Sequence, residues 1–158
     1  MESFVYSAAC TADTEVLGKV LAETLTPGSV ISLIGTLGAG KTLLVGAVAA
    51  ALGVPDGEVA SPTFVLVKEY VSGHIPVYHF DTYRLKDTDE FYELGPDEYF
   101  DADGFTFVEW GDRFEEVLPP DRLEIRITVL SETERSFELA RKGGFSEEVF
   151  NLLAERLS

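Results

Sequence analysis

A short run of small residues between two apolar segments constrains the fold of this chain more than any other stretch. Residues 35–42 read GTLGAGKT and fit the pattern G-x-x-x-x-G-K-[ST]. The preceding segment, Ser29 to Ile34, is apolar enough for a buried strand, and the following segment, LLVGAVAAAL, is helical in pattern and is stopped by Gly53 and Pro55. The chain therefore has a strand, a glycine-rich turn and a helix in direct succession.

The glycines give this turn a chemical use. Without side chains, successive backbone amides can turn inward as an anion-binding nest, and the helix that follows adds the positive end of its dipole. In such a loop the lysine reaches the β- and γ-phosphates of a nucleoside triphosphate, and the hydroxyl after it ligates Mg²⁺. The alternative is a glycine-rich turn with an incidental lysine. The predicted nucleotide-binding loop consists of Gly35, Thr36, Leu37, Gly38, Ala39, Gly40, Lys41 and Thr42.

Two carboxylates at strand ends are candidates for completing a magnesium site. Asp81 ends the segment IPVYHFD, and Glu109 lies at the end of FTFVEW. Mg²⁺ in phosphate-loop proteins is usually supported by a carboxylate in such a position. We expect one of the two to hold the metal and the other to orient an attacking water, and their spacing does not decide which does which.

Two further features allow both a functional and a structural interpretation. The segment SPTF, Ser61 to Phe64, could place the Thr63 hydroxyl near the metal or the γ-phosphate, or it could be a proline turn into a strand. Trp110, the only tryptophan, could be a core residue or a nucleotide contact. His74 and His79 lie near no cluster of cysteines or histidines, so we expect no transition-metal site.

The remaining pattern predicts one α/β domain over residues 1–158, a three-layer sandwich of the P-loop NTPase type with a mixed central sheet. The turn Ser72 to His74 implies an antiparallel strand pair around it. Further strands are expected over 4–8, 63–71, 75–81, 105–110, 123–130 and 136–141, and helices over 13–25, within 87–103, in GDRFEEVLPP and over 146–157, the last capped by Ser146.

Composition limits the partners of the chain. With 28 acidic and 12 basic residues its net charge is −16, which disfavours unaided binding to nucleic acid. Ten acids and no base lie between Lys86 and Arg113, as either a solvated face or a docking surface for a basic partner. No apolar run is long enough to cross a bilayer. A single cysteine, Cys10, and no recognisable export signal lead us to expect a cytoplasmic protein.

Among phosphate-loop proteins of this size, a GTPase is disfavoured because no asparagine-lysine-x-aspartate element is present. Three other function classes remain. A small-molecule kinase would need arginines over the transferred phosphoryl group, and those of this chain are scattered. The other two classes are a partner-activated ATPase and a nucleotide-gated binding module that hydrolyses little.

The later motifs carry a resemblance to a known family. The phosphate loop is followed in order by SPTF, YHFDTYRL (78–85), ELGPDEYF (93–100) and FVEWGD (107–112). This succession closely resembles the bacterial TsaE (YjeE) proteins from the first helix to about Pro119, whereas the last forty residues match only in general pattern. The family commonly has an acidic residue where this chain has Thr36.

The resemblance implies an ATPase that uses Mg²⁺ and supports N6-threonylcarbamoylation of tRNA adenosine. It implies that the partners TsaD and TsaB carry the transfer chemistry and that tRNA is reached only through them. By matching position it assigns Lys41 and Thr42 to phosphates and metal, Glu109 to the metal, and Asp81 to the metal or the water. Thr63 would belong to a switch-like loop, and Trp110 would lie beside the nucleotide.

Overall fold

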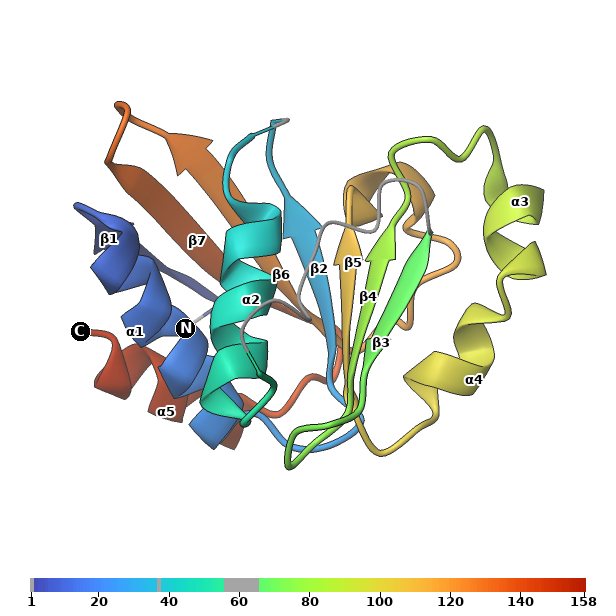
Figure 1. Cartoon of the computed structure of the whole chain (residues 1–158), viewed down its shortest axis with the longest axis horizontal. Coiled ribbons are helices and arrows are strands. Elements are labelled where there is room, and N and C mark those ends of the chain that lie inside the picture. The colour runs from blue at the N-terminus through green and yellow to red at the C-terminus, as the bar shows by residue number, and fades with distance from the viewer. Residues whose placement is uncertain (1, 37, 56–65) are drawn as a thin grey trace.

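A seven-stranded mixed sheet organises the protein (Figure 1). The computed structural model describes residues 2–36, 38–55 and 66–158. The strand order is β1-β7-β6-β2-β5-β4-β3, with parallel pairing from β6 through β4 and antiparallel pairing at both edges. The strands are β1 (Ser3–Ala8), β2 (Val30–Ile34), β3 (Val67–Tyr70), β4 (Val77–Asp81), β5 (Phe105–Glu109), β6 (Arg122–Val129) and β7 (Arg135–Lys142).

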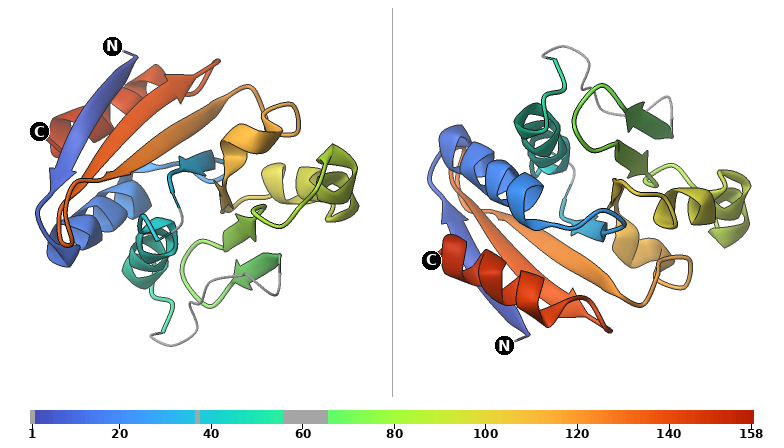
Figure 2. Two further views of the ribbon diagram at one scale, coloured as in Figure 1. Left: turned by 90° about the horizontal axis from the view of Figure 1, so that it is seen from above. Right: turned by 90° about the horizontal axis from the view of Figure 1, so that it is seen from below.

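Helices form a layer on each face of the sheet, which confirms the predicted α/β sandwich with a mixed sheet (Figure 2). One layer contains α1 (Thr11–Thr24), α2 (Lys41–Ala51) and α5 (Glu147–Arg156). The other contains α3 (Thr88–Glu93), α4 (Pro96–Phe100) and the 3₁₀ turn η1 (Gly111–Phe114). The expected helix over GDRFEEVLPP is therefore reduced to one turn. No helix in the described part of the chain is long and apolar enough to cross a membrane.

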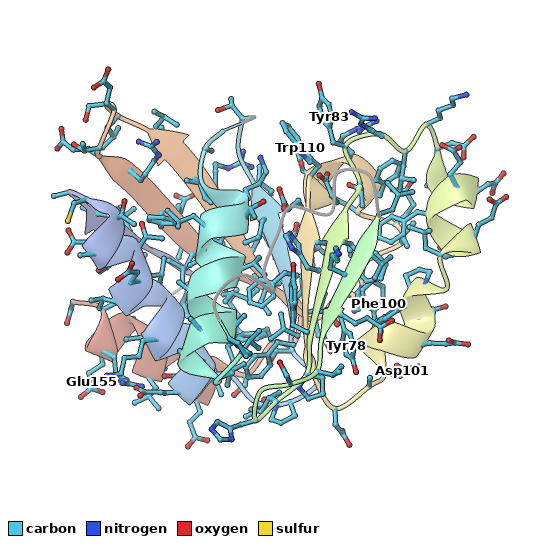
Figure 3. All side chains as sticks on the ribbon, viewed as in Figure 1. Tyr78, Tyr83, Phe100, Asp101, Trp110 and Glu155 are labelled. Atoms are coloured by element: carbon cyan, nitrogen blue, oxygen red, sulfur yellow. The ribbon has the colours of Figure 1, made fainter. Side chains whose placement is uncertain are left out.

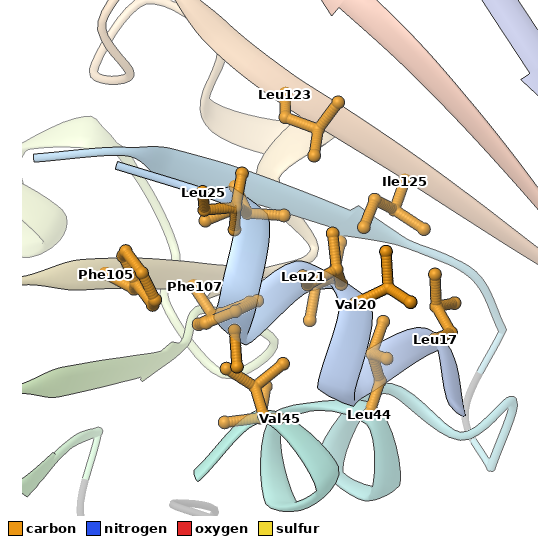
Figure 4. Packing of buried hydrophobic residues seen from close by; sticks show 14 of the residues in the cluster. Leu17, Val20, Leu21, Leu25, Leu44, Val45, Phe105, Phe107, Leu123 and Ile125 are labelled. Atoms are coloured by element: carbon orange, nitrogen blue, oxygen red, sulfur yellow. The ribbon is translucent and has the colours of Figure 1, made fainter. Parts of the chain in front are cut away.

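The central strand β2 is buried along its whole length because it has a helical layer on each side. Ile31 and Leu33 face the cluster formed with α1 and α2, and Val30 faces the smaller cluster on the other side. Figure 4 shows Leu17 and Leu21 of α1 with Leu44 of α2 against residues of the sheet. Burial of each such side chain contributes about 1.5–3 kcal/mol, so the phosphate-loop segment starts from a rigid strand.

The acidic stretch between Lys86 and Arg113 has a local structural use. Asp87 caps α3 by accepting a hydrogen bond from the Glu90 amide at 3.0 Å. Asp89 and Glu90 lie in the first turn of α3, and Asp97 and Glu98 in that of α4. Carboxylates at these positions stabilise the positive helix ends. Part of the negative charge thus supports two short helices.

The segments after residue 120 complete the sheet and its first helical layer. The strands β6 and β7 form a hairpin beside β2 and place Phe137 and Leu139 in the larger core. Ser146 caps α5 by accepting from the Val149 amide at 3.1 Å, as predicted. Arg156 joins the end of α5 to α1 through Thr24 at 2.8 Å and Glu23 at 2.6 Å.

The close approach of α1 and α2 predicts the effect of a helix substitution. A Cβ on Gly18 would lie 2.4 Å from Ala47 Cβ and 2.8 Å from its carbonyl carbon. Glycine to alanine in a helix usually stabilises by roughly 1 kcal/mol, but here overpacking opposes it by about 1–3 kcal/mol. We expect Gly18→Ala to lower the free energy of unfolding in urea, while Lys19→Ala on the exposed face changes it little. A stabilised Gly18→Ala protein would contradict this packing.

Candidate functional site

The parallel strands β2, β5 and β4 end at one edge of the sheet and bring the predicted site together. In register, Leu33 of β2 lies opposite Glu109 of β5, and Glu109 lies opposite Asp81 of β4. The glycine-rich loop follows β2 directly and leads into α2 at Lys41. Residues that are far apart in the sequence therefore share one edge because their strands run parallel and end at the same level.

The loop has the backbone conformation that its glycines predict. Gly38 and Gly40 have φ values of +80° and +111°, which side chains rarely allow. A Cβ on either would meet no atom of the described residues within 4 Å, and such open space suits an anion-binding loop. Gly35 is different, because its Cβ would lie 3.0 Å from the Ile127 carbonyl oxygen. Leu37 lies outside the described residues.

Lys41 is buried at the base of the loop, with 4% of its surface exposed. Its Nζ donates to the carbonyl oxygens of Gly35 at 2.8 Å and Thr36 at 3.0 Å, and lies 3.9 Å from the centroid of the Trp110 ring. Burial lowers the pKa of the Lys41 ammonium, and the carboxylates of Glu109, Asp81 and Asp112 oppose that shift. The ammonium is held by groups that a phosphate could replace.

Glu109 is the centre of a buried polar cluster. It is 5% exposed, and its Oε2 accepts a hydrogen bond from the Thr42 hydroxyl at 3.1 Å. The same oxygen contacts Nε2 of His79, a fully buried residue of β4. A hydroxyl from the start of α2 and a carboxylate from the end of β5 thus meet at hydrogen-bond distance.

Asp81 lies beside this cluster and shapes the chain that follows β4. Its Oδ1 accepts from the Tyr83 amide at 3.0 Å, and Asp81 itself is 8% exposed. The next residue, Thr82, donates from its hydroxyl to the Glu109 carbonyl oxygen at 2.8 Å. These bonds tie the end of β4 to the end of β5 and hold both carboxylates at one level.

The sequence pattern predicted a strand that includes Trp110, but β5 ends at Glu109. Trp110 has a left-handed backbone with φ of +64°. Its amide donates to the Leu33 carbonyl oxygen at 2.9 Å, and its ring packs 5.1 Å from that of Tyr83 (Figure 3). The adjacent Gly111 lies so close to β2 that a Cβ would come within 2.1 Å of Ser32 Oγ. This packing turns the chain and directs the indole toward Lys41.

Arg113 fixes the loop between β4 and α3. Its guanidinium donates to the carbonyl oxygens of Thr82 at 3.2 Å, Tyr83 at 2.6 Å and Leu85 at 3.0 Å. A planar group with several donors suits such a set of acceptors better than a lysine would. Arg113 therefore connects η1, which follows Trp110, to the loop that follows Asp81.

The sequence pattern predicted only part of this site. The predicted residues Lys41, Thr42, Asp81, Glu109 and Trp110 lie together, whereas Thr63 and the rest of SPTF fall outside the described residues. No pattern assigned a role to His79, Tyr83 or Arg113. A signal for His79 existed, because it lies two residues before Asp81 and shares its face of the strand.

The oxygen atoms at the loop suit a hard divalent cation. The Thr42 hydroxyl, the Glu109 carboxylate and Asp81 are the oxygen ligands that Mg²⁺ prefers. Within residues 2–36, 38–55 and 66–158, no group of three or more histidine, cysteine, aspartate or glutamate side chains could hold a metal ion. Such a sparse set fits Mg²⁺, which keeps several waters and is commonly shared with substrate phosphates.

Comparison with known proteins identifies the family. The model of the family "Threonylcarbamoyl adenosine biosynthesis protein TsaE" matches residues 8–137. The chain belongs to the TsaE family. A Bacillus subtilis protein named tRNA threonylcarbamoyladenosine biosynthesis protein TsaE is 41% identical over 146 residues, covering 92% of this chain and 88% of that protein. A Treponema pallidum TsaE protein is 38% identical over 128 residues, covering 81% of this chain and 93% of that protein.

A solved structure extends this likeness to three dimensions. The crystal structure of Bacillus subtilis YdiB superimposes with a TM-score of 0.80 at 32% identity, covering 98% of this chain and 95% of that one. The match to the TsaE family continues to residue 137, beyond the limit near Pro119 that the motifs indicated. The β6–β7 hairpin therefore belongs largely to the family match.

The bonds of Arg113 predict how far the site depends on it. In Arg113→Ala the carbonyl oxygens of Thr82, Tyr83 and Leu85 lose their donor and are left to water. We expect faster amide hydrogen exchange over residues 82–86 and a loss of about 1 kcal/mol in unfolding free energy. Lys86→Ala, which removes an exposed cation of the same loop, is the matched control. Unchanged exchange in Arg113→Ala would show that the guanidinium does not hold this loop.

Proposed function

We propose that this TsaE protein is a Mg²⁺-dependent ATPase that binds the TsaD–TsaB pair and supports threonylcarbamoylation of tRNA adenosine. One observation carries the enzymatic part: Lys41 and the Thr42–Glu109 pair meet at a glycine loop whose backbone is open to an anion. Family membership supports the pathway. The TsaD and TsaB partners come from the family resemblance.

Each residue of the loop has a distinct role in this proposal. The amides of residues 38–42 bind the phosphates, and Lys41 exchanges its two carbonyl acceptors for phosphate oxygens. Mg²⁺, when bound, supplies positive charge that stabilises the transferring phosphoryl group. Thr42 and Glu109 hold the metal, and Asp81, one register position away on β4, orients a metal-bound or attacking water.

The isolated protein is expected to hydrolyse ATP slowly. Arg113 is occupied by three carbonyl oxygens, and Arg135 donates to Ala39 at 3.1 Å and to the β6–β7 turn. Neither guanidinium is free to stabilise transition-state charge, a contribution worth 10³–10⁵ in rate elsewhere. In this proposal, a partner protein completes the ATPase site of this chain.

The net charge of −16 fits an indirect relation to tRNA. A phosphate backbone is repelled by such a surface, so the tRNA would be bound by the partners. Because the reaction proceeds in a complex, ATP turnover should respond to TsaD and TsaB. Rapid turnover by the isolated chain that is unaffected by both partners would count against the proposal.

Replacement of Lys41 tests the assignment of the loop. Lys41→Ala removes an ammonium that would stabilise the transferring phosphoryl group, and we expect phosphate release with TsaD and TsaB present to fall by about 10²–10³-fold. Lys19→Ala, on the exposed face of α1, serves as the control. Normal hydrolysis by Lys41→Ala would refute the site.

The fate of the γ-phosphate separates the proposal from the other two function classes. A small-molecule kinase would transfer labelled γ-phosphate to a metabolite in place of releasing it. A nucleotide-gated binding module would form its complex with ATP and not with ADP while hydrolysis stays at background. One pull-down with ATP, ADP or no nucleotide, followed by phosphate release from the bound fraction, distinguishes all three.

Trp110 provides a direct report of nucleotide binding. Its ring lies 3.9 Å from the Lys41 ammonium, and it is the only tryptophan. If Lys41 turns toward phosphate, the cation leaves the indole face and the fluorescence of Trp110 should change on addition of Mg-ADP. The change should saturate and should be absent in Lys41→Ala. A fluorescence change that never saturates would argue against a specific site.

A further inference from the structure

We propose that His79 is a positioning residue that fixes the Glu109 carboxylate so that one oxygen, Oε1, faces the metal site. The inference deepens the proposed function and rests on it, because it concerns how the same Mg²⁺–nucleotide site is prepared. It goes beyond the phosphate loop and the strand-end carboxylates, which the motif pattern already indicates. The observation behind this inference is a buried histidine to which those motifs assign no role.

His79 is placed to act on Glu109. It is fully buried in β4, opposite Lys68 of β3 and Phe107 of β5 in the strand register. Its side chain lies on the same strand face as Asp81, and its Nε2 contacts Glu109 Oε2. A polar ring in a fully buried position is costly unless it makes a hydrogen bond, so this contact accounts for its presence there.

The surrounding bonds locate the proton of this contact. Glu109 Oε2 already accepts from the Thr42 hydroxyl at 3.1 Å, as a carboxylate oxygen does. The imidazole must then be the donor, which places a proton on Nε2. On the other side of the ring, Nδ1 is buried and has no hydrogen-bond partner among the residues that the structure describes. An unprotonated Nδ1 avoids a buried, unsatisfied N–H.

Two donors on Oε2 leave Oε1 for the cation or its water. Without His79, Thr42 would be the one side-chain donor left to the carboxylate among the described residues, and the carboxylate could rotate about its terminal bond. Partners of this kind orient ligands, and their removal typically lowers metal affinity by about 10–100-fold. The expected effect is on the contribution of Mg²⁺, because His79 bonds to Glu109 and no hydrogen bond joins it to the described residues of the phosphate loop.

The test compares nucleotide binding with and without the metal. ADP affinity is measured by calorimetry in wild type, His79→Leu, His79→Gln and the control His74→Leu, each with Mg²⁺ and with a chelator. We expect the increase in ADP affinity caused by Mg²⁺ to be about 10–100-fold smaller in His79→Leu than in wild type. The ADP affinity of His79→Leu without the metal should be unchanged. His79→Gln, whose amide nitrogen can donate to Glu109, should retain most of that gain. His74→Leu should match wild type.

These outcomes separate the inference from a purely structural role and from failure of the site. Two results would overturn the positioning role and leave the proposed function standing. In the first, His79→Leu loses the same ADP affinity with and without Mg²⁺. In the second, Mg²⁺ raises the ADP affinity of His79→Leu as much as that of wild type. Failure of the wild-type protein to bind ADP in either condition overturns the proposed function.

A second readout needs no ligand and is made on the wild-type protein. In ¹⁵N-labelled wild-type protein, NMR should show a directly bonded proton on His79 Nε2 that is protected from exchange with water. A proton found only on Nδ1 overturns the inference. The assignment of the His79 signal follows from its absence in His79→Gln.

Discussion

Parallel pairing of β2, β5 and β4 is the constraint on which the rest of this structure depends. Because the three strands end at the same edge, the loop after β2, the carboxylate of Glu109 and the carboxylate of Asp81 converge without a long connection. Burial of β2 on both faces fixes the starting point of the loop. A shift of β5 by one residue would turn Glu109 to the other face of the sheet and remove it from Thr42.

Buried polar groups at this edge are costly alone and are therefore linked to one another. Lys41 is held by two carbonyl oxygens and an indole face, and Glu109 by Thr42 and His79. Thr82 bonds to the strand that carries Glu109, and Arg113 bonds to the loop that carries Tyr83. A network of this kind keeps functional groups in place before a ligand arrives, which reduces the ordering that binding must supply.

The sequence predicted the parts of the fold that depend on local pattern. The strand–loop–helix unit followed from glycine spacing between two apolar runs, and the Ser146 cap followed from residue type and position. The antiparallel pair β3–β4 followed from the short turn between its strands. Asp81 and Glu109 were named because Mg²⁺ in phosphate-loop proteins is usually supported by a carboxylate at the end of an apolar strand.

Features that depend on distant contacts could not be predicted in this way. The left-handed backbone of Trp110 arises because Gly111 packs against Ser32, a residue 79 positions earlier in the chain. The task of Arg113 depends on carbonyl oxygens about 30 residues away, and that of His79 on the register between β4 and β5. The helix expected after Trp110 is reduced to the turn η1, and Val117 and Leu118 pack into the smaller core without a helical backbone.

The central claim is that the backbone amides of the glycine loop bind the phosphates of a nucleotide. Residue-level amide hydrogen exchange, with and without saturating Mg-ADP, tests it most directly. The account predicts slower exchange at the amides of residues 38–42, with little change in α5, on the opposite side of the first helical layer from α2. Unchanged exchange in the loop, with protection confined to another part of the chain, would contradict it.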